Sequence, residues 1–413
     1  MKKTDDSKRQ YIIHTLSNGL RVVAAQWPGN VSYTGALINA GSRDEGPAEE
    51  GLAHFVEHTI FKGTKHRRSR HIASRMESIG GELNAYTTKE ETMVYTNAPA
   101  GYVSRSLELI SDLFKTSNFP AKELEKEKEV IIEEIHSYRD SPADAVYDDF
   151  EELIYANSGL AHNILGNPES VRQLSSGQAR SFIDRFYTPG NIVIYCADPN
   201  NPERNIRLIE KYFGDMEFPT ADLQRIIPPD VERFEETRSG DNHQANCLCG
   251  TRLFSRTDPR RHALFLLNNL LAGPCMNSRL NIEMRDRRGL VYTVESSIAL
   301  LSDTGTMQIY FGCEPHMAKR CREIIHNEID RLAQSPMKDS AFGKVRDQYC
   351  GQLILSGEHR ESRAMAMAKS ILFYNEIHDI TTAAEKIREV TPCQMQEVAQ
   401  IIATNGLSSL TLL

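Results

Sequence analysis

The stretch GLAHFVEHTIFKGTKH, residues 51–66, places two histidines and a glutamate in a run that otherwise suits a buried helix. Imidazole and carboxylate groups are costly to bury unless a partner satisfies them. On a helix, His54 and His58 lie one turn apart and point the same way, which is the spacing that lets two imidazoles share one ion. Glu57 lies beside them on the same turn. The pattern HxxEH therefore indicates a zinc site with a neighbouring carboxylate that can move protons.

A catalytic zinc ion takes three protein ligands and keeps one position for water, so the histidine pair requires a third ligand elsewhere. The segment 122–139 predicts a helix in which Glu127 and Glu134 lie one above the other at the margin of the apolar face. Glu133 falls on the solvent side. Glu134 is the expected third ligand, and Glu127 is expected to orient a ligating histidine. The apolar face itself is expected to consist of Leu124, Ile131, Ile135 and Tyr138.

Simpler readings exist for the same residues. A histidine pair four residues apart also arises by accident on helices, and glutamates in a run such as EKEKE (residues 125–129) usually form a solvated face with ion pairs along the helix. For Glu127 taken alone, the solvated face is the stronger interpretation. The metal site rests on the coincidence of the histidine pair with a helix that carries glutamates at its edge.

Composition excludes several classes of protein. The chain has 413 residues, 40% of them hydrophobic, which is enough for two or three domains with cores. The net charge of -8 argues against nucleic acid and against an anionic membrane as partners. The eight cysteines form no CxxC pair, which is typical of reduced thiols. The start of the chain lacks a signal-peptide pattern and no segment resembles a membrane helix, so we expect a soluble, cytoplasmic protein.

Two parts of the chain follow the same plan. Residues 171–197 align without gaps to residues 387–413, and both read as helix, turn, helix, turn, strand. The separation is 216 residues, and the same separation pairs Pro120 with Pro336. A register shared over so much of the chain predicts an internal duplication.

The duplication predicts an α+β fold of two homologous α/β-sandwich domains that face each other across a linker and enclose a space. Strands are expected at 19–26, 32–41 and 92–99, and helices at 52–61, 105–115 and 122–139. The segment 216–242 is rich in proline and charge, as linkers often are. We expect a zinc-bearing catalytic domain at 1–220, a linker at 221–243 and a homologous domain without metal ligands at 244–413.

With these motifs in place, the chain resembles the pitrilysin/insulinase family of inverted-motif zinc peptidases. The resemblance is to the two-domain branch that includes mitochondrial processing peptidases and their bacterial relatives. Residues 51–66 resemble the zinc helix of that family along their whole length. In the family a glutamate 76 positions beyond the second histidine completes the site, which implies Glu134 here. A functionally important glutamate seven residues earlier implies Glu127.

Two further stretches carry the resemblance. GGELNAYTTKEETMVYTNAP (80–99) resembles the edge strand along which the family binds substrate, with Asn84 and Ala85 at substrate-contacting positions. MNSRLNIEMRDRRGLVYTVESS (276–297) resembles the second-half motif whose arginine and tyrosine reach the substrate, here Arg285 and Tyr292. Without the family, Asn84 could be a turn residue, Arg285 part of a charged helix end and Tyr292 a core residue.

The resemblance implies a zinc endopeptidase with one Zn²⁺ per chain that cleaves unstructured peptides or leader segments held as an added β-strand. Glu57 would act as the base, and Tyr292 would steady the charge that develops on the substrate oxygen. The second half has Asn268 and Asn269 in its counterpart of the zinc helix, and Cys350 or one of its neighbours corresponds to Glu134, so that half is expected to hold no metal.

Two other functions remain possible. One is a catalytically inactive family member that serves as a structural or peptide-binding subunit. The other is a metal-carrying protein that captures peptides without cutting them. Because one chain carries both the HxxEH motif and the Arg/Tyr pair, no complementary subunit is required, and we expect a homodimer.

Overall fold

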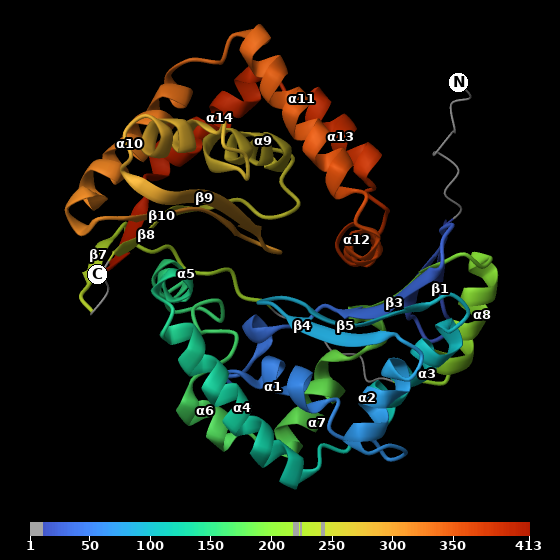
Figure 1. Ribbon diagram of the computed structural model, residues 1–413. Coiled ribbons are helices and arrows are strands. Elements are labelled where there is room, and N and C mark those ends of the chain that lie inside the picture. Colours follow the sequence, from blue (N-terminus) through green and yellow to red (C-terminus); the bar gives the residue numbers. More distant parts are fainter. Residues whose placement is uncertain (1–10, 218–222, 224, 241–243) are drawn as a thin grey trace, which may run out of the picture. The chain divides into compact units, whose positions relative to one another are not determined.

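The computed structural model describes residues 11–217, 223, 225–240 and 244–413 (Figure 1). The described chain forms two compact units. The first unit contains the residues up to Ile135, residues 162–225 and residues 357–379; the second contains residues 136–161, 226–356 and 380–413. Each unit has one β-sheet with helices packed on it, which confirms the α+β class.

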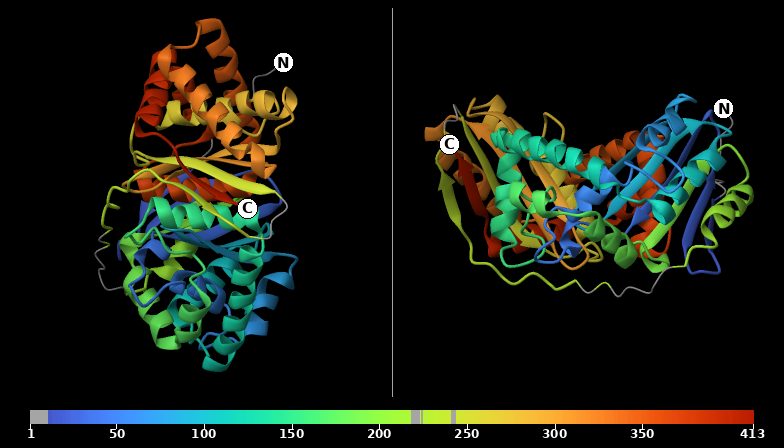
Figure 2. Two further views of the ribbon diagram at one scale, coloured as in Figure 1. Left: turned by 90° about the vertical axis from the view of Figure 1, so that its left-hand side faces the viewer. Right: turned by 90° about the horizontal axis from the view of Figure 1, so that it is seen from below.

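The first unit is built on a sheet with the strand order β1-β2-β6-β3-β5-β4. The strands are β1 (Tyr11–Thr15), β2 (Arg21–Gln26), β3 (Val31–Ile38), β4 (Glu82–Thr87), β5 (Thr92–Pro99) and β6 (Ile192–Asp198). β2 and β6 are parallel, and the other neighbouring pairs are antiparallel. β6 is buried along its whole length, as expected of an apolar central strand that is covered on both faces. β1 and β4 form the two borders, and the blue β1 is visible beside the green α8 (Pro202–Phe213) in Figure 2, right.

One face of this sheet is covered by helices from the first half of the chain. They are α1 (Leu52–Thr59), α2 (Ser69–Glu77), α3 (Val103–Thr116), α4 (Ala121–Arg139), α6 (Pro168–Gln173), α7 (Ser176–Phe186) and α8. Phe55, Leu107, Ile131 and Phe182 from four of these helices share one core with the sheet. α1 packs against both α7 and β4, so the helix with the histidines lies next to the border strand.

The opposite face of the first sheet is covered by a helix from far along the chain. α12 (Arg360–Tyr374) packs on β3 and β6. Its Ala364, Met367 and Ile371 lie against Val23 and Leu37 of the sheet. The first unit is therefore a sheet between two helical layers, of which one comes from the second half of the sequence.

The second unit repeats this arrangement around a sheet with the order β7-β11-β8-β10-β9. The strands are β7 (Glu235–Arg238), β8 (Ala245–Leu253), β9 (Val291–Leu300), β10 (Gly305–Cys313) and β11 (Ser408–Leu412). The larger core is shared with α9 (Arg261–Ala272), α10 (Ala318–Gln334), α11 (Asp339–Ser356), α13 (Ile380–Glu389) and α14 (Pro392–Asn405). A smaller cluster joins α5 (Pro142–Ile154) to β8 and β11 through Val146, Phe150, Leu248 and Leu410.

The duplication predicted from the sequence is present in the structure. β6 begins at Ile192 and β11 at Ser408, and α7 begins at Ser176 and α14 at Pro392, so that both pairs are 216 residues apart. In each sheet the last strand of the half runs parallel to one neighbour and antiparallel to the other. The border strand β9 takes the place that β4 has in the first sheet.

The compact units and the sequence halves differ at two segments. α5 lies in residues 136–161, which belong to the second unit, and α12 lies in residues 357–379, which belong to the first. α5 follows α4, and α12 follows α11, the helix that repeats α4 in the second half. The corresponding helix of each half therefore belongs to the compact unit of the other half. The strand β7 lies inside the segment 221–243 that the sequence suggests as a linker; residues 221, 222, 224 and 241–243 of that segment lie outside the described residues.

The expected secondary structure is confirmed within a few residues at each end. The strands expected at 19–26, 32–41 and 92–99 are β2, β3 and β5, and the helices expected at 52–61, 105–115 and 122–139 are α1, α3 and α4. The placement of Tyr138 on a buried apolar face was wrong, because the residue is 45% exposed and lies in the segment 136–161 of the second unit. Among the described helices, none is both long and apolar enough to cross a membrane.

Candidate metal centre and active site

The two histidines of the motif lie on α1, where the prediction places them. His54 is buried and His58 is half-buried, and the centres of their rings are 4.5 Å apart. The helix follows Gly51, whose φ of +86° suits glycine, and a Cβ there would come within 2.6 Å of the Leu165 carbonyl oxygen. This tight contact restricts the residue that precedes α1 to glycine.

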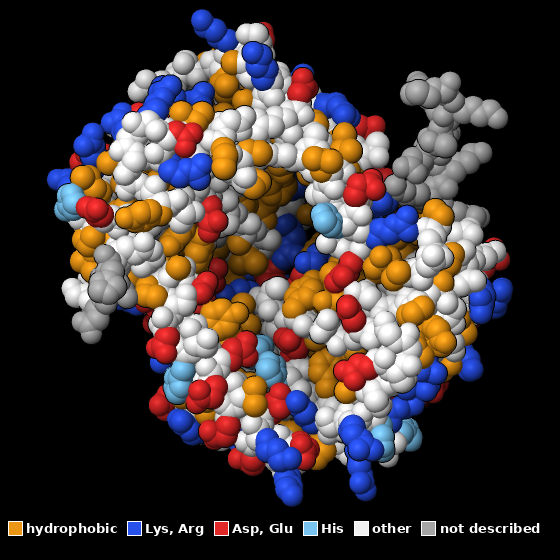
Figure 3. All heavy atoms as spheres, viewed as in Figure 1, with side chains coloured by type: hydrophobic (Ala, Val, Ile, Leu, Met, Phe, Trp, Pro, Cys, Tyr) orange, Lys and Arg blue, Asp and Glu red, His pale blue; other side chains and the backbone are white. Residues whose placement is uncertain are grey.

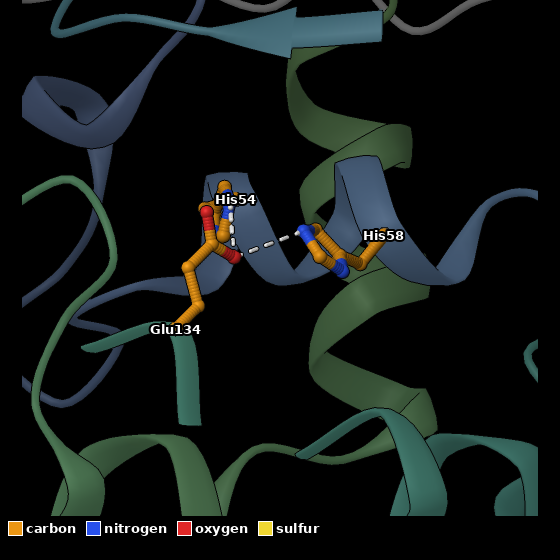
Figure 4. A group of neighbouring side chains, drawn as sticks. All are labelled: His54, His58 and Glu134. Carbon is orange, nitrogen blue, oxygen red and sulfur yellow. Dashed lines mark ion pairs between the residues drawn. The ribbon is translucent and has the colours of Figure 1, made fainter. Parts of the chain in front are cut away.

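Glu134 approaches the histidines from α4, as Figure 4 shows. Its Oε2 atom is 3.8 Å from Nε2 of His54 and 3.5 Å from Nε2 of His58. The ligand atoms of the three side chains lie within 4.8 Å of one another, and no other group of three such residues in the described part of the chain does so. Bonds of about 2.0–2.1 Å in a tetrahedral zinc site would separate ligand atoms by about 3.4 Å. The spacing therefore fits one zinc ion with little movement.

The glutamates of α4 differ in solvent exposure as the helical phase predicts. Glu133 is exposed, whereas Glu134 is partly covered and Glu127 is buried. Figure 3 shows acidic side chains gathered over α4, so the solvated-face interpretation holds for part of this helix. It does not hold for Glu127.

Glu127 joins His58 to a lysine. Its Oε1 is 3.0 Å from Nδ1 of His58, and its Oε2 is 2.7 Å from Nζ of Lys62. Burial works against the charge of Glu127, but the hydrogen bonds from His58 and Lys62 lower the pKa of this carboxyl below its usual range. A carboxylate that accepts the Nδ1–H of His58 leaves the Nε2 lone pair directed at Glu134, the arrangement that a metal-binding histidine needs.

The electrostatics keep His54 neutral. Burial, assisted by the nearby His58, lowers the pKa of His54 to about 3. Its Nδ1 atom is buried and has no hydrogen-bond partner among the described residues. A neutral imidazole is the form that binds a metal, so His54 needs no deprotonation at neutral pH.

Glu57 lies on α1, and its carboxyl group lies near Thr87 at the end of β4. Burial raises its pKa; the Thr87 hydroxyl and His58 act against that rise, and Glu134 adds to it. Oε2 of Glu57 is buried without a hydrogen-bond partner in the described structure. A carboxylate with a raised pKa and a free oxygen beside a metal site is suited to general-base work.

The substrate-contacting residues expected in the first half lie on β4. This strand pairs with β5 on one side only and is a border of the sheet. Asn84 is exposed and Ala85 is half-buried, and both lie inside the strand. Asn84 is therefore a strand residue and not a turn residue. The structure does not test whether either residue binds substrate, so that role stays a prediction.

The residues expected in the second half lie near the start of β9. Tyr292 is 71% exposed, which rules out the core reading. Arg285 is half-buried on a turn of π-helix, η3 (Asn281–Asp286), with its Nε 3.5 Å from Asp286. A π-helical turn often marks a functional site, but the contact with substrate remains a prediction.

The counterpart of the zinc helix in the second half is α9, where Asn268 donates a hydrogen bond to the Ser296 carbonyl oxygen and Asn269 is buried. Cys350 on α11 is buried and its Sγ is 3.8 Å from the Ala384 carbonyl oxygen. These side chains are engaged in ordinary packing.

Sequence reasoning did not assign Lys62. Lys62 lies beyond the end of α1 at Thr59, so helical spacing from His58 does not indicate its role. What the sequence could not supply was the distance from Lys62 to Glu127, which lies on α4.

Two histidines on one helix, a glutamate from a second helix and a free carboxylate beside them have the arrangement of an inverted-motif zinc site. The protein-family model described as insulinase (peptidase family M16) matches residues 21–168 of this sequence. The family model described as peptidase M16 inactive domain matches residues 173–349. The chain belongs to the insulinase family, peptidase family M16. The word inactive applies to a segment that contains neither the histidine pair nor Glu134.

Curated relatives carry the same family character. An uncharacterised zinc protease of Bacillus subtilis is 32% identical over 396 residues, which cover 96% of this chain and 94% of that protein. An uncharacterised zinc protease of Streptomyces coelicolor is 31% identical over 397 residues, covering 94% of this chain and 86% of that protein.

Solved structures agree in fold. A protease from Helicobacter pylori superimposes with a TM-score of 0.91 at 20% identity, covering 98% of this chain and all of that one. A putative M16-like peptidase from Alicyclobacillus acidocaldarius gives 0.85 at 21% identity and covers 98% of both chains. At these identities the structures support the fold alone.

Proposed function

We propose that this protein is a zinc-dependent endopeptidase that cleaves unstructured peptides or leader segments. The observation that carries the proposal is the convergence of the ligand atoms of His54, His58 and Glu134 within 4.8 Å, beside Glu57 with its unpartnered buried oxygen. A purely structural metal site would have no use for such a carboxylate, since structural zinc is closed by four ligands.

His54, His58 and Glu134 would hold one zinc ion per chain. When bound, zinc polarises a carbonyl group and lowers the pKa of water to about 7. Glu57 accepts the proton from the attacking water and returns it to the leaving amine, for which its raised pKa is suited. Glu127 holds His58 in the required tautomer throughout, because its own charge is stabilised by Lys62.

The substrate would lie along β4 as an added strand, bound through backbone hydrogen bonds at Asn84 and Ala85. Such binding requires an extended substrate backbone and depends little on the sequence of the substrate side chains. Arg285 and Tyr292 would bind the substrate from the second half, with Tyr292 also steadying the charge on the scissile oxygen. A space enclosed by the two halves would then admit flexible chains and exclude folded proteins.

We further propose a cytoplasmic homodimer whose partners are peptides, without a nucleic-acid or membrane partner. The eight cysteines are all free, and six of them are buried, as suits a reducing compartment. The net charge of -8 supports the exclusion of nucleic acid and anionic membranes. The alternative, an inactive structural or peptide-binding subunit, is less well supported because the chain retains a complete ligand set and Glu57.

The test uses one model protein in two forms, native and reduced-and-alkylated, incubated with the zinc-loaded enzyme. Mass spectrometry should find internal cleavages in the unfolded form only, and a chelator should abolish them until zinc is added back. Binding of the unfolded form without cleavage would refute the enzyme and favour a peptide-binding subunit. Cleavage of both forms would refute the enclosed space while leaving the peptidase intact.

A further inference from the structure

The N-terminus of the zinc helix α1 is capped by a residue outside the helix. Gly51 at the N-cap position has no side chain, and the first turn contains no acidic residue. The carboxylate of Glu45 caps the helix instead. Its Oε2 accepts a hydrogen bond from the Gly51 N–H at 2.9 Å, and its Oε1 accepts one from the Ala53 N–H at 2.7 Å. Ala53 directly precedes His54, so this cap ends one residue before the first metal ligand.

The capping carboxylate is itself held by a histidine. Nε2 of His162 is 2.9 Å from Oε2 of Glu45 and 2.8 Å from the Ser42 carbonyl oxygen. The Glu45 side chain has no exposed surface, and a buried carboxylate needs such partners. Burial raises the pKa of Glu45 to about 7, while His162 and the amides of Ala53 and Gly51 oppose that rise.

The backbone around His162 is fixed independently. Nζ of Lys89 donates a 2.6 Å hydrogen bond to the carbonyl oxygen of His162. His162 is also the residue at which the chain returns to the first unit after the segment that carries α5. The imidazole is thus presented to Glu45 from a segment whose backbone Lys89 also holds.

We propose that Glu45, supported by His162, is a positioning residue for the metal centre. An anion at a helix N-terminus stabilises the first turn through its free N–H groups and the helix dipole. Here that turn leads directly into His54, so the Glu45 carboxylate fixes the direction in which the first imidazole approaches zinc. Neither residue touches the metal or the substrate in this role. The inference rests on the proposed function only in taking zinc as the metal.

The experiment measures two quantities in full-length protein: the zinc dissociation constant by competition with a chelator, and amide hydrogen exchange of peptides that cover α1 in the metal-free protein. The variants are Glu45→Gln, Glu45→Ala, His162→Leu and His162→Gln. Gln at position 162 keeps a donor near the position of Nε2, whereas Leu removes it. Glu50→Gln is the matched control, since Glu50 lies on the same loop and its Oε2 accepts a hydrogen bond from the Asn167 side chain at 2.9 Å.

We expect Glu45→Ala to weaken zinc binding about tenfold or more, as loss of an orienting partner does. Glu45→Gln and His162→Leu should have smaller effects in the same direction, and His162→Gln should recover most of the affinity. Exchange in α1 should rise in the same order, and Glu50→Gln should match the wild type. Circular dichroism identifies any variant that fails to fold, and for Glu45→Ala the gentler Glu45→Gln then decides.

The inference would be overturned if Glu45→Gln and His162→Leu bound zinc as tightly as the wild type and showed the same hydrogen exchange in α1. It would also be overturned if Glu50→Gln lost as much zinc affinity as these variants. If the wild-type protein bound no zinc, the proposed function would fail, and the exchange measurement would still decide whether Glu45 caps α1. The two failures are therefore distinguishable.

Discussion

The substitution Glu134→Gln, which replaces a carboxylate by an amide, should remove most zinc from the protein. In the proposed site Glu134 contributes one of three ligand atoms, 3.8 Å and 3.5 Å from the two histidine nitrogens. Four-ligand structural zinc sites bind with about 10–16 kcal/mol, which is about 3 kcal/mol per ligand. Losing that much from Glu134→Gln weakens zinc binding about a hundredfold.

The same loss can be read from thermal stability. At free zinc a thousandfold above the wild-type dissociation constant, binding stabilises the fold by about 4.1 kcal/mol, and a hundredfold weaker variant retains about 1.4 kcal/mol. A unit of about 200 residues shifts its midpoint by about 2–4 °C per kcal/mol. The zinc-dependent rise in Tm should therefore be about 5–10 °C smaller in Glu134→Gln than in the wild type.

The matched control is the adjacent residue. Glu133 is exposed on the same helix, and Glu133→Gln makes the same chemical change one position away. Its zinc content, by plasma emission spectrometry, and its zinc-dependent rise in Tm should equal those of the wild type. Loss of zinc from Glu133→Gln with retention in Glu134→Gln would refute the assignment of the third ligand.

Three other expectations follow. The pKa of Asp112 is lowered because hydrogen bonds from Thr116, His66 and Thr64 outweigh the effect of burial. The stability that its charge contributes is therefore present above the unfolded pKa of about 3.9 and is lost as pH falls through the folded value. Asp112→Asn should cost about 2 kcal/mol at pH 7 and progressively less in denaturant titrations below pH 4; a cost independent of pH would contradict this. Glu127→Gln should weaken zinc binding about 10–100-fold in chelator competition, and an unchanged affinity would contradict its orienting role. Tyr292→Phe should lower kcat/KM for an unstructured peptide about 100–1,000-fold with zinc content unchanged, whereas full activity would remove the hydroxyl from the reaction.

The convergence of the candidate metal ligands could be predicted because each depends on local periodicity. The spacing of His54 and His58 and the phase of Glu134 against Leu124 and Ile131 are both helical properties, and α1 and α4 are helices over nearly the expected ranges. The edge position of β4 followed from a resemblance to a known family and not from its composition. The duplication was visible because helix starts and strand starts repeat without insertions at one separation.

The exchange of α5 and α12 could not be predicted, because an apolar helical stripe shows that a helix is buried but not which sheet buries it. Met367 and Ile371 would suit either unit by hydrophobicity. The exchange has a consequence for dissecting the protein: a fragment of residues 1–220 lacks the helix that covers Val23 and Leu37, so an inactive fragment would reveal little about how the halves cooperate.

Contacts across long stretches of sequence escaped prediction for the same reason. Glu45 and His162 are separated by 117 residues, and nothing in the local pattern of either indicates the other. Likewise, nothing in the sequence around Lys62 indicates its contact with Glu127. Such partners are fixed by how elements pack, whereas ligands that share a helix are fixed by the helix itself.

The most direct test of the proposed peptidase is the activity of Glu57→Gln beside the wild type, each with its zinc content measured on the same sample. We expect equal zinc and an unchanged fold in both proteins, with cleavage of an unstructured peptide by the wild type and none by the variant, because the amide can neither accept nor return the proton of the attacking water. Substantial cleavage by zinc-replete Glu57→Gln, or none by the zinc-replete wild type, would contradict it.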